Sequence, residues 1–575
     1  MKKYNDEYKR WLEFDGLTEI ERSELKKIEN DEEAKQLRFG ASMDFGTAGL
    51  RSTMYMGIGC MNRFTVAQTT RGIAALIRSA GGESRGVAIA YDSRNNSELF
   101  ARVSACVLAS EGIKSYIFNG IRPTPELSFA VRKLGTMAGI NITASHNPKE
   151  YNGYKAYWED GAQISPEQAK VVSAERARFD VLGGELADFD KAVESGIIEI
   201  LDERFDEYYI DEVIKTAISP NEVKSVADDL KVVYTPLHGA GYKLVPEVFS
   251  RVGLNYLYTV DEQMIPDGNF PTVKKPNPEY ADVFEKGIAI ANKVGSDLII
   301  ATDPDSDRVG VMARNKEGVF VNISGNQMGA LLLDYAIRQR RALGKLPEGA
   351  YAVKSIVSTD MAYGIAKKQG VKLHDVLTGF KFIGEVIKNY EAKGEADGFI
   401  LGFEESYGYL LGSYARDKDA VEASMMILEM TAFYRKQNMT LCDALECLYE
   451  AYGNYAEGMI DIYMEGFDGI ERRKRVMSSL RANAPTAFGE YKVATVGDYL
   501  DGTVKSLKDG SVSATGQPSS DVLYYTLENE DKIVVRPSGT EPKIKIYVLA
   551  HDTDRAVLDE KIKIYSDAAR KLADV

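Results

Sequence analysis

A strand–helix–strand pattern occurs three times in this chain, and it limits the possible folds more than any other feature. Each copy contains three short apolar runs separated by helical sequence, and the third run leads into a polar loop. The runs are 86–92, 115–118 and 137–142, then 231–234, 256–260 and 297–302, then 351–357, 372–377 and 398–403. Because short apolar strands that alternate with amphipathic helices usually form parallel sheets covered on both faces, the sequence predicts an α/β fold of three related units.

The pattern changes near residue 457, and the remaining sequence favours a smaller α+β domain. A chain of 575 residues that is 44% hydrophobic has enough apolar material for several cores. We therefore expect four domains packed around one central cleft, with boundaries at 1–212, 213–325, 326–455 and 456–575. Ligand loops at the carboxyl ends of the strands are expected to line that cleft.

Composition excludes several kinds of partner and location. The net charge of −15 argues against a broad surface for nucleic acid or for an anionic membrane, so an anionic substrate would need a local basic pocket. No apolar run approaches the roughly 20 residues that span a bilayer, and the N-terminus does not resemble a signal peptide. Four cysteines are too few for a disulfide framework. We expect a cytoplasmic protein that acts on small molecules.

The segment from Asn141 to Pro148, Asn-Ile-Thr-Ala-Ser-His-Asn-Pro, is the first candidate site. A strand-like run delivers the hydroxyl of Ser145 into a turn, with His146 beside it and Lys155 ten residues further on. A serine presented in this way suits a residue that carries a transferable group. The segment from Tyr91 to Arg94 is expected to support this loop.

Asp303, Asp305 and Asp307 stand at alternate positions directly after the third strand of the second unit. Carboxylates at this spacing can converge on one hard cation such as Mg²⁺ or Mn²⁺ and leave room for a phosphate oxygen. The loop does not match an EF-hand, because Arg308 stands where the turn glycine belongs. An acidic, solvated turn is the alternative that spacing alone leaves open. The adjacent arginine favours a site that faces phosphate.

Further polar loops have compositions that suit phosphate or sugar, although each one also reads as an ordinary turn. The loop 536–542 combines an arginine, two hydroxyls and a glycine, as phosphate-binding loops often do. The loop 402–408 offers carboxylates and hydroxyls that could recognise a sugar, and 378–381 could line the same cleft. The charged run 416–419 and the glycine-punctuated loop 45–51 complete the set.

Taken in order, these loops resemble those of the α-D-phosphohexomutase superfamily, and most closely its phosphoglucomutase/phosphopentomutase branch. The resemblance covers roughly Phe45 to Tyr547, and all four signature loops occur in the family's order: 143–148, 303–308, 402–408 and 536–542. It implies three domains with mixed α/β sheets, a smaller C-terminal domain and a central cleft. It also implies interconversion of glucose 1-phosphate and glucose 6-phosphate through a glucose 1,6-bisphosphate intermediate.

The resemblance further implies roles for individual residues. Ser145 would be phosphorylated in the resting enzyme, and Mg²⁺ would be held by Asp303, Asp305, Asp307 and a phosphoserine oxygen. The implied substrate contacts are Arg308, Thr378, Gly379, Glu404, Ser406, Arg536, Ser538, Gly539 and Thr540. The implied catalytic residues are Ser145, His146, Arg51, Lys155 and Lys418.

Proton transfer is the least defined part of this expectation. Lys155 is the candidate acceptor for the proton of the attacking hydroxyl, and a neighbouring cation could depress its pKa into a useful range. Some family members carry a histidine just after the glutamate–serine pair of the sugar loop, whereas Tyr407, Gly408 and Tyr409 follow Ser406 here. Lys418 is therefore the candidate for the second acid/base.

Several alternatives stay open at this point. Ribose or mannose phosphate could replace glucose phosphate with the same mechanism, because pocket shape decides between them. The Asp303-Pro304-Asp305 sequence also fits the Asp-x-Asp that follows a strand in phosphatases of the haloacid-dehalogenase type, in which the first aspartate becomes phosphorylated. A sugar-phosphate sensor without turnover is a further possibility. The sequence is compatible with a monomer or a homodimer.

Overall fold

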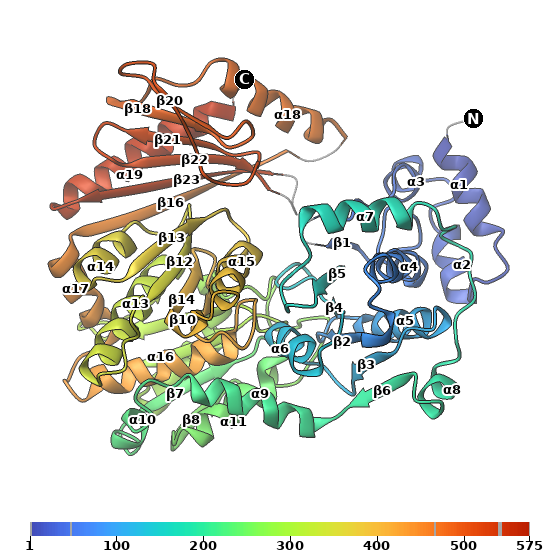
Figure 1. Cartoon of the computed structure of the whole chain (residues 1–575), viewed down its shortest axis with the longest axis horizontal. Helices are drawn as coiled ribbons and strands as arrows, with labels where there is room; N and C mark the ends of the chain where they lie inside the picture. The colour runs from blue at the N-terminus through green and yellow to red at the C-terminus, as the bar shows by residue number, and fades with distance from the viewer. Residues whose placement is uncertain (1–2, 47–48, 465–466, 539–542, 574–575) are drawn as a thin grey trace.

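The computed structural model describes residues 3–46, 49–464, 467–538 and 543–573. Four sheets follow one another along the chain, and Figure 1 shows each with its own helices. The N-terminal domain lies at the right of that view, and the C-terminal sheet lies at the upper left. None of the described helices combines the length and the apolar sequence that crossing a bilayer requires.

The first sheet has six strands in the order β1-β5-β4-β2-β3-β6. Its strands are β1 (Leu50–Thr53), β2 (Val87–Tyr91), β3 (Ser115–Phe118), β4 (Ala138–Ile142), β5 (Tyr151–Trp158) and β6 (Ile198–Leu201). The helices of this part are α1 (Lys3–Leu12), α2 (Glu19–Lys26), α3 (Glu32–Phe39), α4 (Arg63–Ser79), α5 (Ser97–Ser110), α6 (Thr124–Leu134), α7 (Pro166–Arg176) and α8 (Phe189–Glu194), with a 3₁₀ turn at Glu83–Arg85.

The second sheet has five strands in the order β11-β10-β9-β7-β8. They are β7 (Lys231–Thr235), β8 (Tyr256–Thr259), β9 (Leu298–Thr302), β10 (Val309–Arg314) and β11 (Phe320–Ile323). The accompanying helices are α9 (Glu203–Lys215), α10 (Glu222–Ser225), α11 (Gly241–Arg251) and α12 (Glu285–Val294), with 3₁₀ turns at Asp261–Gln263 and Ala281–Phe284.

The third sheet has four strands in the order β13-β12-β14-β15. They are β12 (Tyr351–Ser355), β13 (Lys372–Val376), β14 (Phe399–Glu404) and β15 (Gly408–Leu410). The helices are α13 (Gly325–Ala342), α14 (Met361–Gln369), α15 (Phe380–Glu391), α16 (Ala420–Arg435) and α17 (Leu441–Tyr452), with a 3₁₀ turn at Ala396–Gly398.

The C-terminal sheet is antiparallel and runs in the order β16-β23-β22-β21-β18-β19-β20. Its strands are β16 (Asn454–Tyr463), β18 (Tyr491–Asp498), β19 (Thr503–Ser506), β20 (Val512–Ala514), β21 (Leu523–Leu527), β22 (Lys532–Pro537) and β23 (Lys543–Asp552), with the short β17 (Ala487–Phe488) paired to β18. The helices are α18 (Phe467–Ala482) and α19 (Arg555–Arg570), followed by a 3₁₀ turn at Lys571–Ala573.

The threefold repeat expected from the sequence is confirmed in the topology of the first three sheets. In each one, the first strand of the repeat lies between the second and the third and pairs in parallel with both: β3-β2-β4, β8-β7-β9 and β13-β12-β14. A fourth strand then pairs antiparallel with the third, as β5, β10 and β15 do. The sheets are therefore mixed, as the family resemblance implied, and the pattern of apolar runs alone did not reveal the antiparallel strand.

The three polar loops join the third and fourth strands, so each lies inside a β-hairpin. Each loop contains one non-glycine residue in the left-handed region: Ser145 with φ 52°, Ser306 with φ 51° and Tyr407 with φ 67°. L-residues adopt this conformation rarely, because the Cβ atom approaches the backbone closely. The repeat thus extends to the backbone conformation of its loops.

The first three domains share one large apolar core, whereas the fourth docks through a separate contact. The shared core continues from β2 and α6 through the second sheet to α13 and α16. Ile356, Val357 and Leu377 of the third domain pack with Val534 and Tyr547 of the fourth. An ion pair of 2.6 Å between Lys532 Nζ and Asp360 Oδ2 lies at the same junction.

The N-terminal helices α1–α3 form a small aromatic cluster on the first domain. Trp11 is fully buried and packs edge-on against Phe39 and Phe64. Of the predicted boundaries, residue 212 lies within α9, residue 325 is the first residue of α13, and residue 455 lies within β16, the first strand of the C-terminal sheet. They remain predictions.

Candidate active site

The serine loop presents Ser145 in the hairpin between β4 and β5. Ser145 is nearly fully buried, and its Oγ donates a hydrogen bond of 2.8 Å to Asp303 Oδ2. The Oγ also lies 3.1 Å from Nδ1 of His146. The apolar strand β4 is buried along its whole length, which fixes the base of the loop. The hydroxyl of the first domain therefore meets the acidic loop of the second.

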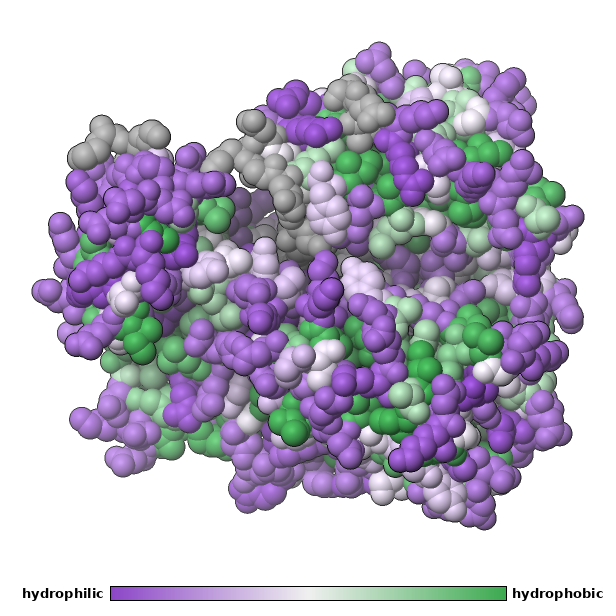
Figure 2. All heavy atoms as spheres, turned by 180° about the vertical axis from the view of Figure 1, so that it is seen from behind, coloured by the Kyte–Doolittle hydropathy of each residue, from purple (hydrophilic) through white to green (hydrophobic). Residues whose placement is uncertain are grey.

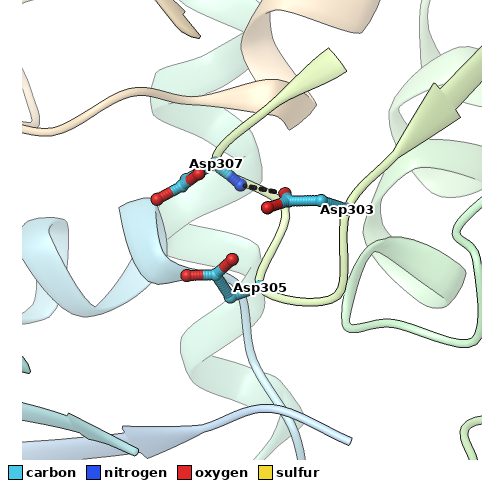
Figure 3. A group of neighbouring side chains, drawn as sticks. All are labelled: Asp303, Asp305 and Asp307. Atoms are coloured by element: carbon cyan, nitrogen blue, oxygen red, sulfur yellow. Dashed lines mark hydrogen bonds between the residues drawn. The ribbon is translucent and has the colours of Figure 1, made fainter. Parts of the chain in front are cut away.

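Asp303, Asp305 and Asp307 converge in the hairpin between β9 and β10, as Figure 3 shows. All three are buried, and one carboxylate oxygen of each lies within 4.8 Å of the others. Asp303 Oδ1 accepts the backbone N–H groups of Asp307 and Arg308 at 3.1 and 3.0 Å. These bonds close the loop and turn the three side chains toward one point.

The carboxylate cluster has the donor set that a hard divalent cation requires. Oδ1 of Asp305 and Oδ1 of Asp307 are buried and have no hydrogen-bond partner among the described residues. Burial, followed by repulsion from Asp305 and Asp307, raises the pKa of Asp303 well above its usual range. Three converging carboxylates with buried oxygens that lack a hydrogen-bond partner fit Mg²⁺ or Mn²⁺.

Two buried lysines pair with the same aspartates. Lys155 Nζ, on β5, lies 2.7 Å from Asp305 Oδ2 and 3.0 Å from Asp307 Oδ2. Lys418 Nζ lies 3.1 Å from Asp307 Oδ2 and 3.0 Å from Asp417 Oδ1. The next residue, Asp419, caps α16 by accepting the N–H groups of Val421 and Glu422, which fixes the backbone beside Lys418.

The structure corrects the expectation that a neighbouring cation depresses the pKa of Lys155. Burial by itself would lower this pKa, but Asp305 and Asp307 outweigh burial and raise it above the ordinary lysine value. Asp307, Asp417 and Glu404 likewise outweigh burial and raise the pKa of Lys418. Both lysines are therefore ammonium groups in this arrangement. The sequence showed the nearby cations but not the closer carboxylates.

His146 is the neutral group next to Ser145. Burial, followed by repulsion from Arg308 and Arg51, lowers the pKa of His146 well below its ordinary value. Arg51, on β1, donates from Nη1 to Asn147 Oδ1 at 3.2 Å. The two arginines thus flank the serine loop with positive charge, while the imidazole keeps a lone pair.

The sugar loop between β14 and β15 places Glu404 against the end of β13. Glu404 Oε1 accepts the backbone N–H of Gly379 at 2.6 Å. Gly379 has φ 123°, which only glycine adopts readily, so this contact depends on the glycine. Burial is the main cause that raises the pKa of Glu404 to about 7, and Lys418 opposes it.

One cleft of about 350 Å³ joins loops from all four domains. This volume lies in the range of small-molecule sites. Figure 2 shows a hollow between the N-terminal domain at the left and the C-terminal domain at the upper right. The predicted residues that line the cleft are Arg51, His146, Arg308, Thr378, Gly379, Glu404, Ser406, Arg536 and Ser538. Ser145, the aspartates and the two lysines are buried next to this lining. Gly539 and Thr540 lie outside the described residues.

Sequence reasoning missed part of the lining. Residues Lys275, Asn277, Glu279 and Tyr280 enter the cleft from the second domain, and Glu279 Oε1 lies 2.5 Å from Nη1 of Arg308. Their segment follows no strand directly, so the strand-then-polar-loop pattern did not find it. The rigid Pro276-Asn277-Pro278 turn was the available signal. Thr124 was also missed; its Oγ1 donates to Asp305 Oδ2 at 2.7 Å.

Models of the phosphoglucomutase/phosphomannomutase family match four segments of the chain. The three α/β/α domains match residues 42–179, 207–318 and 324–452, and the C-terminal domain matches residues 501–562.

Individual relatives agree with these matches. A phosphoglucomutase from Staphylococcus aureus (strain USA300) is 37% identical over 511 residues, which cover 89% of this chain and 90% of that protein. Among solved structures, parafusin (phosphoglucomutase) from Paramecium aligns with a TM-score of 0.67 at 18% identity, over 93% and 96% of the two chains. A family protein from Burkholderia thailandensis aligns with a TM-score of 0.64 at 20% identity, over 92% and 97%. The chain belongs to the phosphoglucomutase/phosphomannomutase family, within the α-D-phosphohexomutase superfamily.

Proposed function

We propose that this protein is a phosphoglucomutase that interconverts glucose 1-phosphate and glucose 6-phosphate through phosphorylated Ser145. The observation that carries this proposal is the contact of 2.8 Å between Ser145 Oγ and Asp303, inside a cluster of three buried carboxylates. This cluster adjoins a cleft with an arginine-bearing loop from the C-terminal domain. Relatives named phosphoglucomutase support the choice of glucose.

Asp303, Asp305, Asp307 and an oxygen on Ser145 would hold Mg²⁺. When bound, the ion would neutralise charge on the transferring phosphoryl group and offset the carboxylate charge beside Lys155. Arg51 and Arg308, which flank the serine loop, would bind the phosphoryl oxygens. The Glu404 carboxylate would accept hydrogen bonds from sugar hydroxyls, and the Ser406 hydroxyl would donate a hydrogen bond to a sugar oxygen.

The chemical step moves one phosphoryl group from Ser145 to the sugar. The Oγ–phosphorus bond breaks while a bond forms between phosphorus and the free sugar hydroxyl, whose proton passes to the neutral imidazole of His146. Lys155 would accept this proton only once Mg²⁺ has offset the carboxylates that keep it an ammonium group. The product is glucose 1,6-bisphosphate, which turns end for end and returns its other phosphoryl group to Ser145. Arg536, Ser538, Gly539 and Thr540 would clamp whichever phosphate is distant from the serine. Lys418 would supply the second acid/base.

We also propose that the protein is cytoplasmic, that it is a monomer or a homodimer, and that its four domains have boundaries at 212, 325 and 455. The acidic charge and the few cysteines support the location. The four sheets and their order along the chain support the division into domains.

The deciding experiment compares kcat/KM for glucose 1-phosphate and ribose 1-phosphate, with Mg²⁺ and a trace of glucose 1,6-bisphosphate. We expect a preference for glucose 1-phosphate and complete loss of turnover in Ser145→Ala. A preference for ribose 1-phosphate would refute the choice of sugar and keep the mechanism. An acyl phosphate on Asp303 that hydroxylamine removes, with none on Ser145, would refute the mechanism.

A further inference from the structure

One buried side chain, Arg94, holds the carbonyl side of the serine loop. Its Nη1 donates to the carbonyl oxygens of Pro148 and Tyr151, both at 2.9 Å. Its Nη2 donates to the carbonyl oxygen of Ser145 at 2.5 Å and also to that of Asn147. A single guanidinium therefore gathers four carbonyl groups of the hairpin that carries the reactive hydroxyl.

A second chain of hydrogen bonds holds the amide side of Ser145. The Ser145 N–H donates to Thr143 Oγ1 at 2.8 Å, and the Thr143 hydroxyl donates to Asp92 Oδ2 at 2.6 Å. The same Asp92 oxygen lies 3.3 Å from Nε of Arg94. Asp92 and Arg94 have no exposed side-chain surface, so water does not compete for these bonds. Both backbone polar groups of Ser145 are thus tied, directly or through Thr143, to one buried ion pair.

This double attachment explains how Ser145 keeps its unfavourable backbone conformation. A residue other than glycine in the left-handed region is strained by roughly 1–3 kcal/mol and persists only where its surroundings hold it. Ser145 has φ 52° and is 1% exposed. Because the direction of the Cα–Cβ bond follows from the backbone, fixing the N–H and the C=O also fixes the position of Cβ. The hydrogen bond of 2.8 Å from Oγ to Asp303 Oδ2 then selects the rotamer.

We propose that Arg94, acting with Asp92 and Thr143, is a positioning residue that aims Ser145 Oγ for phosphoryl transfer. It does not touch the reacting atoms. Its role is geometric: it holds the strained serine loop in one conformation, and this conformation places the side chain whose oxygen forms and breaks the bond to phosphorus. Displacement of a reacting group by about 1 Å can cost about 100-fold in rate, so the gain from such positioning is large.

The seat of Arg94 also connects the serine loop to the second domain. The guanidinium carbon lies 5.1 Å from the centre of the Phe270 ring, and Phe270 is buried. Gly268, from the same segment, lies so close that an added Cβ would be 2.3 Å from the backbone N of Asn95. Asn95 Nδ2 in turn donates to Asn269 Oδ1 at 3.1 Å. The segment 268–270 belongs to the domain that carries the three aspartates, and it packs against Arg94.

Lysine cannot replace Arg94 in this position. An ammonium group presents a compact charge on a flexible chain, whereas the guanidinium offers a planar fork of donors that reaches several carbonyls at once. Arg94→Lys therefore keeps the charge next to Asp92 and removes the geometry. Arg71 provides a matched control. It is a buried arginine of the same domain, its hydrogen bond among the described residues goes to the Glu185 carbonyl, and it lies outside the cleft lining.

The positioning role of Arg94 rests on the proposed phosphoserine chemistry, and the test distinguishes a failure of that role from a failure of the proposed function. Wild-type enzyme is first labelled with ³²P from glucose 1,6-bisphosphate, and the labelled residue is identified. Label absent from Ser145 in the wild type refutes the proposed function. With label present, the rate of transfer to an accepted sugar phosphate is measured by rapid quench and divided by the amount of phosphoserine. A folding defect lowers the number of labelled sites, but it does not lower the rate at each one.

We expect Arg94→Lys to slow transfer per labelled site by about 100-fold with KM unchanged, and Arg71→Lys to keep the wild-type rate. Thr143→Val, which frees the Ser145 N–H and leaves Arg94 in place, is expected to slow transfer by a smaller factor. A wild-type rate per site in Arg94→Lys overturns the proposal. If Arg94→Lys does not fold, a wild-type rate per site in Thr143→Val overturns it instead.

Discussion

Neutralising Asp303 and neutralising Asp307 should change stability in opposite directions, although both residues belong to the same carboxylate cluster. Asp307 Oδ2 accepts a hydrogen bond from Lys155 Nζ at 3.0 Å and forms an ion pair with Lys418 Nζ at 3.1 Å, and both ammonium groups are nearly buried. No lysine or arginine ion pair is recorded for Asp303 among the described residues, and its partners are the Ser145 hydroxyl and two backbone N–H groups. Asp307 is thus needed to balance the charge of the two lysines, whereas Asp303 adds repulsion to the other carboxylates.

The magnitude follows from the partners that remain. In Asp307→Asn, Lys155 keeps Asp305 at 2.7 Å and Lys418 keeps Asp417 at 3.0 Å. We therefore expect a loss near the lower end of the range for broken buried pairs, about 3 kcal/mol. For a domain of this size that lowers Tm by on the order of 10 °C. In Asp303→Asn the amide oxygen can still accept the two N–H groups, so Tm should equal or exceed that of the wild type.

The assay is thermal unfolding of each protein after treatment with EDTA, followed by titration with Mg²⁺. The metal-free melts should rank Asp303→Asn at or above the wild type, with Asp307→Asn lowest. Mg²⁺ at about 100 times its Kd should stabilise the wild type by about 2.7 kcal/mol and both variants by less. Equal losses of Tm in the two variants, or a lower melt for Asp303→Asn, would refute the assignment of charge within the cluster.

Three further outcomes are expected. Arg536→Ala should raise KM for the sugar phosphate at least tenfold while kcat changes little, since each charge-assisted hydrogen bond contributes about 1.5–3 kcal/mol. An unchanged KM would refute the proposal that Arg536 binds the distant phosphate. Burial and then Asp419 raise the pKa of Glu422 to about 8 from 4.5, so folding stability is lost as pH rises through that interval. Glu422→Gln should therefore have a higher Tm than the wild type near pH 9 and an equal Tm near pH 4. A lower Tm for Glu422→Gln near pH 9 would contradict this pH dependence. Lys532→Ala breaks the 2.6 Å pair with Asp360 and should increase proteolysis between the third and fourth domains. The free energy of unfolding should fall by only about 1 kcal/mol or less, because the pair is partly exposed.

Sequence reasoning succeeded where a local pattern determines the structure. The nine strands of the repeat were placed within a few residues, because each is a short apolar run. β2, β4 and β9 are buried throughout, whereas the edge strands β8 and β13 are only partly buried. The aspartate loop was found for the same reason, since it follows such a strand without a gap. The antiparallel strand β15 was missed because it has only three residues, Gly408–Leu410, and lacks a distinct pattern.

Properties that depend on distant contacts could not be found in this way. The pKa of Lys155 was expected to fall, but it rises because two aspartates about 150 residues away lie within 3.0 Å. Glu279 lines the cleft through an ion pair with Arg308 that no local spacing indicates. The helices α1–α3 likewise form a separate cluster whose partner, Phe64, lies on α4.

The three hairpins show why one repeated unit can support three different tasks. In each of the first three domains the third strand ends at a turn with one left-handed residue. The backbone of this turn is therefore similar in all three, although the side chains that it carries differ. The first turn carries a hydroxyl, the second carries carboxylates and the third carries the glutamate and serine of the sugar loop. Their meeting requires domain packing, since Ser145 reaches Asp303, and Lys418 of the third domain reaches Asp307 of the second. Chemistry at this site is therefore a property of the interfaces, and a variant that loosens one interface should impair transfer even when every hairpin remains folded.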